Sequence, residues 1–190
     1  MRGPSDKQFE PTVSAQFVAA IHDRLREFDG MRVGDARTCP SCGSDDHRKN
    51  GYQSRKKTFA RLITNDGIED VGVEVQLYEC KQCGSTYQGD FSEQFYEGCE
   101  YARPVVDLCL FHAAGLNYSD CERALRDRYG LQVDRDTIER YDRRFDDSQA
   151  DRRGILIAGE TLSLHFLSFL FGEDDADEPN FVITDTTALW

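Results

Sequence analysis

The chain contains two short cysteine motifs, Cys39-Pro40-Ser41-Cys42-Gly43 and Cys80-Lys81-Gln82-Cys83-Gly84. A Cys-x-x-Cys turn directs two thiolates at one point, and a second turn completes the tetrahedral set of four sulfurs that closed structural zinc sites use. The glycine after each pair suits a tight turn, because glycine adopts positive φ at little cost. Two disulfides or a redox couple are the alternative, but no thioredoxin-like βαβ pattern surrounds either motif. The sequence therefore predicts one structural Zn²⁺ bound by Cys39, Cys42, Cys80 and Cys83.

Between the motifs the hydrophobic pattern is that of a β-hairpin. Apolar and polar residues alternate over residues 71–77, which predicts a strand that runs into Cys80. An apolar run at residues 59–63 precedes the turn signal Asn65-Asp66-Gly67, so the two runs are expected to pair with each other. Residues 87–91 predict a further short strand.

Residues 35–98 are thus predicted to form a zinc ribbon. Its hairpins are too small to bury a core of their own, so the binding energy of the metal is expected to contribute directly to folding. Residues 1–34 are predicted as an N-terminal helical segment, because apolar residues recur at helical spacing over residues 12–28 and Gly30 ends the pattern.

In the segment after the second motif the hydrophobic period becomes helical. A first helix is predicted from Pro104, a second from the capping-box sequence Ser119-Asp120-Cys121-Glu122, and a third from Asp134. Three helices joined by short glycine-containing turns are typical of a helix-turn-helix domain. Residues 99–146 are therefore predicted as such a DNA-binding domain, and the fold class as α+β.

The third helix carries the candidate DNA-contacting residues, which are Arg135, Thr137, Arg140 and Arg144. A recognition helix presents such side chains to the major groove, where arginine can bind guanine bidentately. Acidic residues dilute the positive charge of this helix, and an ordinary helical bundle with an ion-paired surface is the alternative. The sequence also holds one basic cluster, which consists of Arg55, Lys56 and Lys57. This cluster is expected either to contact phosphates or to be a solvated strand end.

The net charge of −12 is concentrated in the last 45 residues, which carry ten acids and two bases. The chain has 18 Arg against 5 Lys, together with 22 Asp, a bias that resembles halophilic archaeal proteins; an acidic protein of a mesophile is the alternative. Acidity ordinarily argues against nucleic-acid binding, but at molar salt the Debye length falls to about 3 Å and only close contacts count. The sequence shows no secretory h-region and no run of membrane-spanning length. It therefore predicts a cytoplasmic protein without membrane association, with Cys99, Cys109 and Cys121 as reduced thiols.

Three stretches carry a resemblance to a known family: Tyr101-Ala102-Arg103-Pro104-Val105-Val106-Asp107-Leu108, Gly115-Leu116-Asn117-Tyr118-Ser119 and Val133-Asp134-Arg135-Asp136-Thr137-Ile138-Glu139-Arg140-Tyr141. They resemble the N-terminal region of insertion-sequence transposases, in particular those of haloarchaea. In that family a zinc ribbon and a helix-turn-helix precede an RNase H-like domain in which Asp, Asp and Glu hold two metal ions. The resemblance covers residues 39–145 and implies sequence-specific binding to double-stranded DNA at the ends of an element. Regulators and other DNA-binding proteins share these modules.

Residues 147–190 are predicted as an acidic segment that, by the resemblance, includes the start of an incomplete RNase H-like domain. A strand-like run from Phe181 leads to Asp185, the candidate catalytic residue and ligand for Mg²⁺ or Mn²⁺. A solvent-facing loop aspartate is the alternative. Two-metal phosphoryl transfer needs several convergent carboxylates. The chain is therefore expected to be a fragment of a transposase that cannot catalyse transposition by itself.

The sequence is thus compatible with three functions. The first is DNA binding by the front part of a transposase-like protein, the second a zinc-ribbon transcriptional regulator, and the third a zinc-stabilised protein-interaction module. The expected partner in the first two is double-stranded DNA, and homo-oligomers of the chain are left open.

Overall fold

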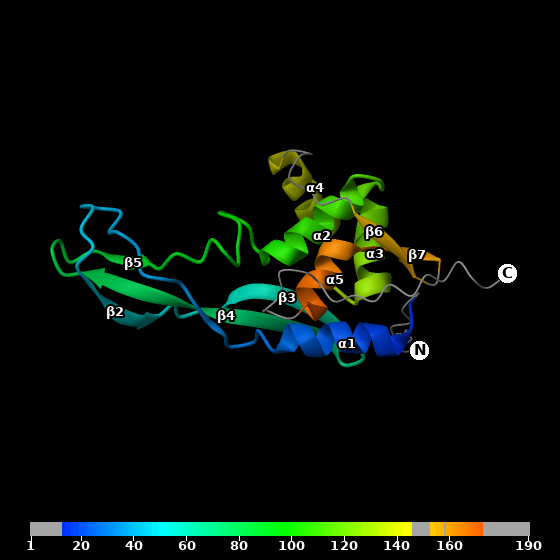
Figure 1. The fold of residues 1–190 in the computed structure, drawn as a ribbon, viewed down its shortest axis with the longest axis horizontal. Coiled ribbons are helices and arrows are strands. Elements are labelled where there is room, and N and C mark those ends of the chain that lie inside the picture. The colour runs from blue at the N-terminus through cyan, green and yellow to red at the C-terminus, as the bar shows by residue number, and fades with distance from the viewer. Residues whose placement is uncertain (1–12, 146–152, 158, 173–190) are drawn as a thin grey trace, which may run out of the picture.

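The structure, a computed structural model, describes residues 13–145, 153–157 and 159–172. Strands dominate its N-terminal half and helices its C-terminal half, and the molecule is elongated (Figure 1). In chain order the elements are α1 (Ala15–Arg26), β1 (Arg32–Val33), β2 (His47–Tyr52), β3 (Lys57–Thr64), β4 (Gly67–Cys80), β5 (Thr86–Gln88), α2 (Arg103–Ala113), α3 (Tyr118–Tyr129), α4 (Arg135–Arg144), β6 (Gly154–Ile157), β7 (Glu160–Ser163) and α5 (Leu164–Phe171). The α+β class is therefore confirmed.

Strand β4 is the spine of the main sheet and runs along the long axis of the molecule (Figure 1). Its first half pairs antiparallel with β3, and its middle, at Glu74 and Val75, pairs parallel with β1. Its second half pairs antiparallel with β2 and with β5. The predicted hairpin is confirmed, because Thr64 and Gly67 are partners that flank the turn Asn65-Asp66.

The buried side of β4 changes near its middle. Val71, Val73 and Val75 are at most 1% exposed and belong to the main core, whereas Gln76, Tyr78 and Cys80 are at most 6% exposed. Because successive side chains of a strand point to opposite faces, these two sets lie on opposite sides of the sheet. The helical half of the molecule thus covers one face of the spine, and the cysteine-containing loops cover the other face further along.

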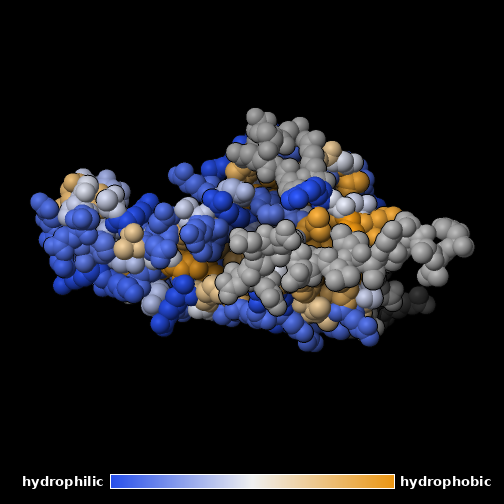
Figure 2. All heavy atoms as spheres, viewed as in Figure 1, coloured by the Kyte–Doolittle hydropathy of each residue, from blue (hydrophilic) through white to orange (hydrophobic). Residues whose placement is uncertain are grey.

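Two hydrophobic clusters follow from this arrangement. The larger one joins strands β3 and β4 to all five helices. The smaller one contains only Cys39, Tyr78, Cys80 and Tyr87. The end of the molecule that carries the smaller cluster is mostly hydrophilic on the face shown in Figure 2. Because this cluster has so few members, little apolar burial stabilises that end.

Helices α2, α3 and α4 pack against one another. The predicted N-cap of α4 is confirmed, because the Asp134 carboxylate accepts the N–H of Thr137. The predicted start of α3 at Ser119 is wrong. The side chain of Asn117 accepts the N–H of Asp120 at 3.0 Å, so the helix begins two residues earlier than the capping box indicated. Asn stabilises a helix N-terminus at least as well as Ser does. Because Asn117 precedes Ser119 in the chain, the helix begins at the earlier cap.

The turn between α3 and α4 is hydrogen bonded to the outer edge of β3. The N–H of Ile63 donates to the carbonyl of Gly130 at 2.7 Å, and the N–H of Gln132 donates to Arg61 at 2.9 Å. His22 of α1 donates to the same Gly130 carbonyl at 3.0 Å. These bonds fix the α3–α4 turn to the sheet and to α1.

The C-terminal described part consists of the β6–β7 hairpin and α5, which lie against the helices (Figure 1). The N–H of Ser163 donates to the Tyr129 hydroxyl, and Arg24 donates to the carbonyl of Leu170 at 2.8 Å. Asp185 lies outside the described residues. Within the described ranges, no helix has the length and apolar character that crossing a membrane requires.

Candidate metal centre

The four predicted cysteine ligands converge at the far end of β4. All four Sγ atoms lie within 4.8 Å of one another. The Sγ atoms of Cys39 and Cys83 are 3.7 Å apart, and those of Cys42 and Cys80 are 3.6 Å apart. A tetrahedron with Zn–S bonds of about 2.3 Å has S···S edges of about 3.8 Å. The four cysteines therefore form a site with the dimensions of a structural metal centre.

The two motifs fold as near-identical turns around this point. In the first, Cys39 N–H donates to the carbonyl of Ser44 and Gly43 N–H donates back to Cys39, both at 2.8 Å. The second repeats the pattern with Cys80, Ser85 and Gly84 at 2.9 Å. Gly43 and Gly84 share a φ of 74°, which glycine adopts without strain. The repeated sequence thus produces a repeated turn, and each turn brings one buried and one exposed sulfur to the site.

The charge balance of the cluster also favours a bound cation. The Ser85 hydroxyl lies 3.2 Å from Cys39 Sγ and lowers the pKa of that thiol to about 6. Cys42 accepts the N–H of Ser44, which favours its thiolate, but its hydrogen bonds to the neighbouring thiols raise its pKa to about 12. Four adjacent thiols cannot all ionise against one another. A divalent cation among them removes this conflict, because it stabilises every thiolate.

Helix α4 presents three of its four predicted DNA-contacting residues to solvent. The side chain of Arg135 is 58% exposed and pairs with Asp136, and that of Arg140 is 60% exposed and lies 3.9 Å from a Glu100 oxygen. The guanidinium of Arg144 lies beside Gly98 and 5.8 Å from the ring of Phe145.

Thr137, the fourth predicted residue, is turned inward. It is 5% exposed, and its hydroxyl donates to the Asp134 carboxylate at 3.1 Å. The structure therefore places Thr137 in the N-terminal cap of α4 and not on its solvent face. Ile138 and Tyr141 are also buried, and they anchor the inner face of the helix.

The predicted basic cluster does not form one patch. Lys57 is half-buried, donates to the carbonyl of Cys99 at 2.8 Å and lies 4.6 Å from the Phe95 ring centroid. Burial lowers the pKa of Lys57. Lys56 pairs with Asp29 at 3.0 Å, and Arg55 is exposed. Only Arg55 and Lys56 are therefore placed where an external phosphate can reach them.

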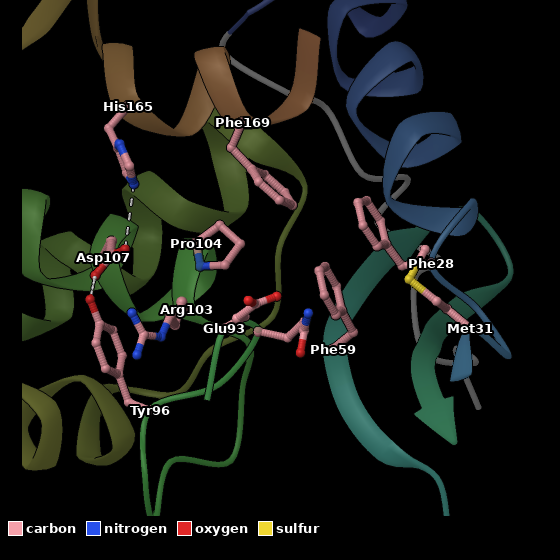
Figure 3. Close-up of a pocket in the computed structure, with 11 residues that line it drawn as sticks. Phe28, Met31, Phe59, Glu93, Tyr96, Arg103, Pro104, Asp107, His165 and Phe169 are labelled. Atoms are coloured by element: carbon pink, nitrogen blue, oxygen red, sulfur yellow. Dashed lines mark hydrogen bonds and ion pairs between the residues drawn. The ribbon is translucent and has the colours of Figure 1, made fainter. Parts of the chain in front are cut away.

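Sequence reasoning missed a cavity of about 640 Å³, which lies between the segment after α1, strand β3, the loop at residues 93–96 and helices α2 and α5 (Figure 3). Asp107 lies at its edge, where it accepts a hydrogen bond from Tyr96 at 2.8 Å and lies 3.5 Å from His165. Burial raises the pKa of Tyr96 to about 12, so this hydroxyl remains a neutral donor. One signal was available in the sequence: Arg103 and Asp107 are four residues apart on a mostly apolar helix.

No protein-family model matches the chain, and no curated protein or solved structure is significantly similar to it. The functional assignment therefore depends on the geometry of the chain itself. The four-cysteine site is its most specific feature, because it joins residues from two distant motifs in the dimensions of one metal ion.

Proposed function

We propose that the protein binds one structural Zn²⁺ and recognises double-stranded DNA, as the N-terminal part of a transposase-like protein. In this proposal residues 35–98 form a zinc ribbon, and α3 and α4 form a helix-turn-helix. The observation that carries the DNA-binding part is the two-sided character of α4. Its inner face is anchored by Ile138 and Tyr141, and its outer side carries four arginines, Arg135, Arg140, Arg143 and Arg144.

The zinc would have no catalytic part in this function. Four sulfur ligands close the coordination shell and leave no position for water. Cys39, Cys42, Cys80 and Cys83 would hold the ion, which stabilises the end of the sheet that has the smaller hydrophobic cluster.

Among the arginines of α4, Arg140 is the strongest candidate for contact with a base. Arg135 and Arg143 are engaged by Asp136 and Glu139 at 3.2 and 2.5 Å, whereas the nearest carboxylate oxygen to Arg140 is 3.9 Å away. The Arg140 guanidinium also donates to the Thr137 hydroxyl at 3.3 Å, so it is less strongly engaged by carboxylates than the guanidinium groups of Arg135 and Arg143. A planar guanidinium that faces the major groove can donate to O6 and N7 of guanine.

We expect Arg140→Ala to weaken binding to a cognate duplex by about 1–3 kcal/mol and to relax specificity at one base pair. Cognate sites would first be selected from a random duplex pool, and affinities then measured by fluorescence anisotropy at several salt concentrations. Arg32→Ala is the matched control, because Arg32 is 69% exposed on β1, on a different element. Equal losses on cognate and random DNA would count against base reading by α4. Failure to select any duplex would remove the DNA-binding proposal and favour a protein-interaction module.

As part of a transposase-like protein, the chain would recognise the ends of the element, and Asp185 would be a ligand for Mg²⁺ or Mn²⁺. These ions retain most of their waters unless several protein oxygens converge on them. Asp185→Ala should therefore leave DNA affinity unchanged, and the 190-residue chain should show no strand cleavage in the presence of Mg²⁺ or Mn²⁺. Cleavage by the wild-type chain that is lost in Asp185→Ala would show a complete site and contradict this expectation.

A further inference from the structure

The cavity beside α2 and α5 has one aromatic wall. Phe28 and Phe59 stack with ring centroids 4.4 Å apart, and Phe169 of α5 stacks on Phe28 at 5.5 Å. Met31, which is 42% exposed, extends the wall towards the surface (Figure 3). This wall can take up an apolar or aromatic group of a ligand, and ring pairs of this kind add to the free energy of burial.

The opposite wall holds two opposite charges that do not pair with each other. Arg103 is brought close to Glu93 in space, because the backbone N–H of Arg103 donates to the carbonyl of the adjacent Gln94 at 2.8 Å. Yet the Arg103 guanidinium lies over the Tyr96 ring at 4.4 Å, and the Glu93 carboxylate points towards Phe59 (Figure 3). Within the described part of the chain neither side chain has an ion-pair partner, and Arg103 Nε is buried without an acceptor.

The other charged groups of this wall are already engaged. Asp107 accepts from Tyr96 and faces His165, and its side chain is only 13% exposed. The polar wall therefore offers a ligand one cation, Arg103, and one carboxylate, Glu93. A guanidinium matches the geometry of a carboxylate, and a carboxylate accepts from an ammonium group.

We propose that this cavity binds a free α-amino acid with an apolar or aromatic side chain. Its carboxylate would bind Arg103, its ammonium group Glu93, and its side chain would pack on Phe28 and Phe169. The cavity volume of about 640 Å³ lies within the usual range of small-molecule sites. A ligand with only one of the two charges leaves either Arg103 or Glu93 unmatched. The proposal is independent of DNA binding, so its failure leaves the proposed function standing.

The test uses the zinc-loaded full chain and three ligands of the same ring size: L-phenylalanine, 3-phenylpropionate, which lacks the ammonium group, and 2-phenylethylamine, which lacks the carboxylate. Isothermal titration calorimetry should show saturable binding of L-phenylalanine. The affinity for 2-phenylethylamine should be about 10- to 100-fold lower, because this ligand leaves the buried Arg103 Nε without a partner. The affinity for 3-phenylpropionate should be about 3- to 10-fold lower, because Glu93 is exposed and remains hydrated when no ammonium group pairs with it. Absence of saturable L-phenylalanine binding up to its solubility would overturn the proposal.

Two variants assign the charges. Arg103→Gln should lower the affinity for L-phenylalanine about 10-fold or more and leave the affinity for 2-phenylethylamine unchanged. Glu93→Gln should lower the affinity for L-phenylalanine and leave the affinity for 3-phenylpropionate unchanged. Phe169→Ala should lower the affinity for all three ligands to the same extent. Arg32→Gln serves as the surface control and should leave all three affinities unchanged. Melting temperature and zinc content would show that each variant is folded. If folded Arg103→Gln and Glu93→Gln bind L-phenylalanine as well as the wild type does, the polar wall is not the recognition site and the proposal is wrong.

Discussion

Cys80→Ser is expected to abolish stoichiometric zinc binding and to unfold the cysteine-bearing end of the molecule. Cys80 is fully buried and ends β4, and it belongs to the small cluster with Cys39, Tyr78 and Tyr87. Structural zinc in small modules contributes about 10–16 kcal/mol of apparent binding free energy, far more than so few buried side chains can supply. The helices share the larger core with β3 and the first part of β4, and this core excludes the cysteine site, so helical circular dichroism should largely remain while near-ultraviolet signals from Tyr78 and Tyr87 are lost.

Metal analysis after dialysis against a moderate chelator measures the first effect. Cys121→Ala is the matched control, because Cys121 is buried in α3, outside the four-cysteine site, and this variant should retain one zinc per chain. Acidification should also release the metal, since ligand thiols must be deprotonated to bind it. A Cys80→Ser protein with full zinc content and an unchanged melting temperature would contradict the metal assignment.

Gly130→Ala is expected to destabilise the protein by about 2–5 kcal/mol. Gly130 has a φ of 65°, which costs a residue with a side chain about 1–2 kcal/mol. An added Cβ would also collide with His22 and lie 2.7 Å from Val18 Cγ1, and overpacking of this kind costs about 1–3 kcal/mol more. Both partners belong to α1, so the substitution would separate α1 from the α3–α4 turn.

Urea denaturation monitored by circular dichroism would measure this loss. Gly115→Ala is the matched control, because a Cβ at Gly115 meets no atom within 4 Å and its φ is not in the positive range. This control should be neutral or slightly stabilising, since alanine has less conformational entropy to lose on folding. Equal stability of the two variants would show that the α1 contact at Gly130 contributes little.

Local patterns in the sequence predicted most of the elements and the clustering of the four cysteines. The turn at Asn65-Asp66-Gly67, the N-cap at Asp134 and the spacing of the cysteine motifs each depend on a few neighbouring residues, and the structure confirms all three. Such signals act within a turn or two of the chain, so sequence alone is sufficient to read them.

Tertiary contacts decided the rest. Lys57 is engaged by the carbonyl of Cys99, and its half-buried position follows from packing against Phe91 and Phe95. The inward position of Thr137, by contrast, follows from helical spacing, because Thr137 precedes the buried Tyr141 by four residues and so lies on the same face of α4. The cavity near Arg103 is built from five separate segments, so the spacing of Arg103 and Asp107 on one helix was not enough to reveal it.

The change of buried side along β4 restricts how this chain can vary in length. Insertion of a single residue between Val75 and Gln76 would rotate Tyr78 and Cys80 to the opposite face of the strand, because the side-chain period is two. The metal site would then lose a ligand, while Val71 to Val75 kept their places in the core. Insertion of two residues would preserve the face and shift the site by about 7 Å along the strand. In relatives of this chain, length differences in the middle of β4 should therefore occur in even numbers.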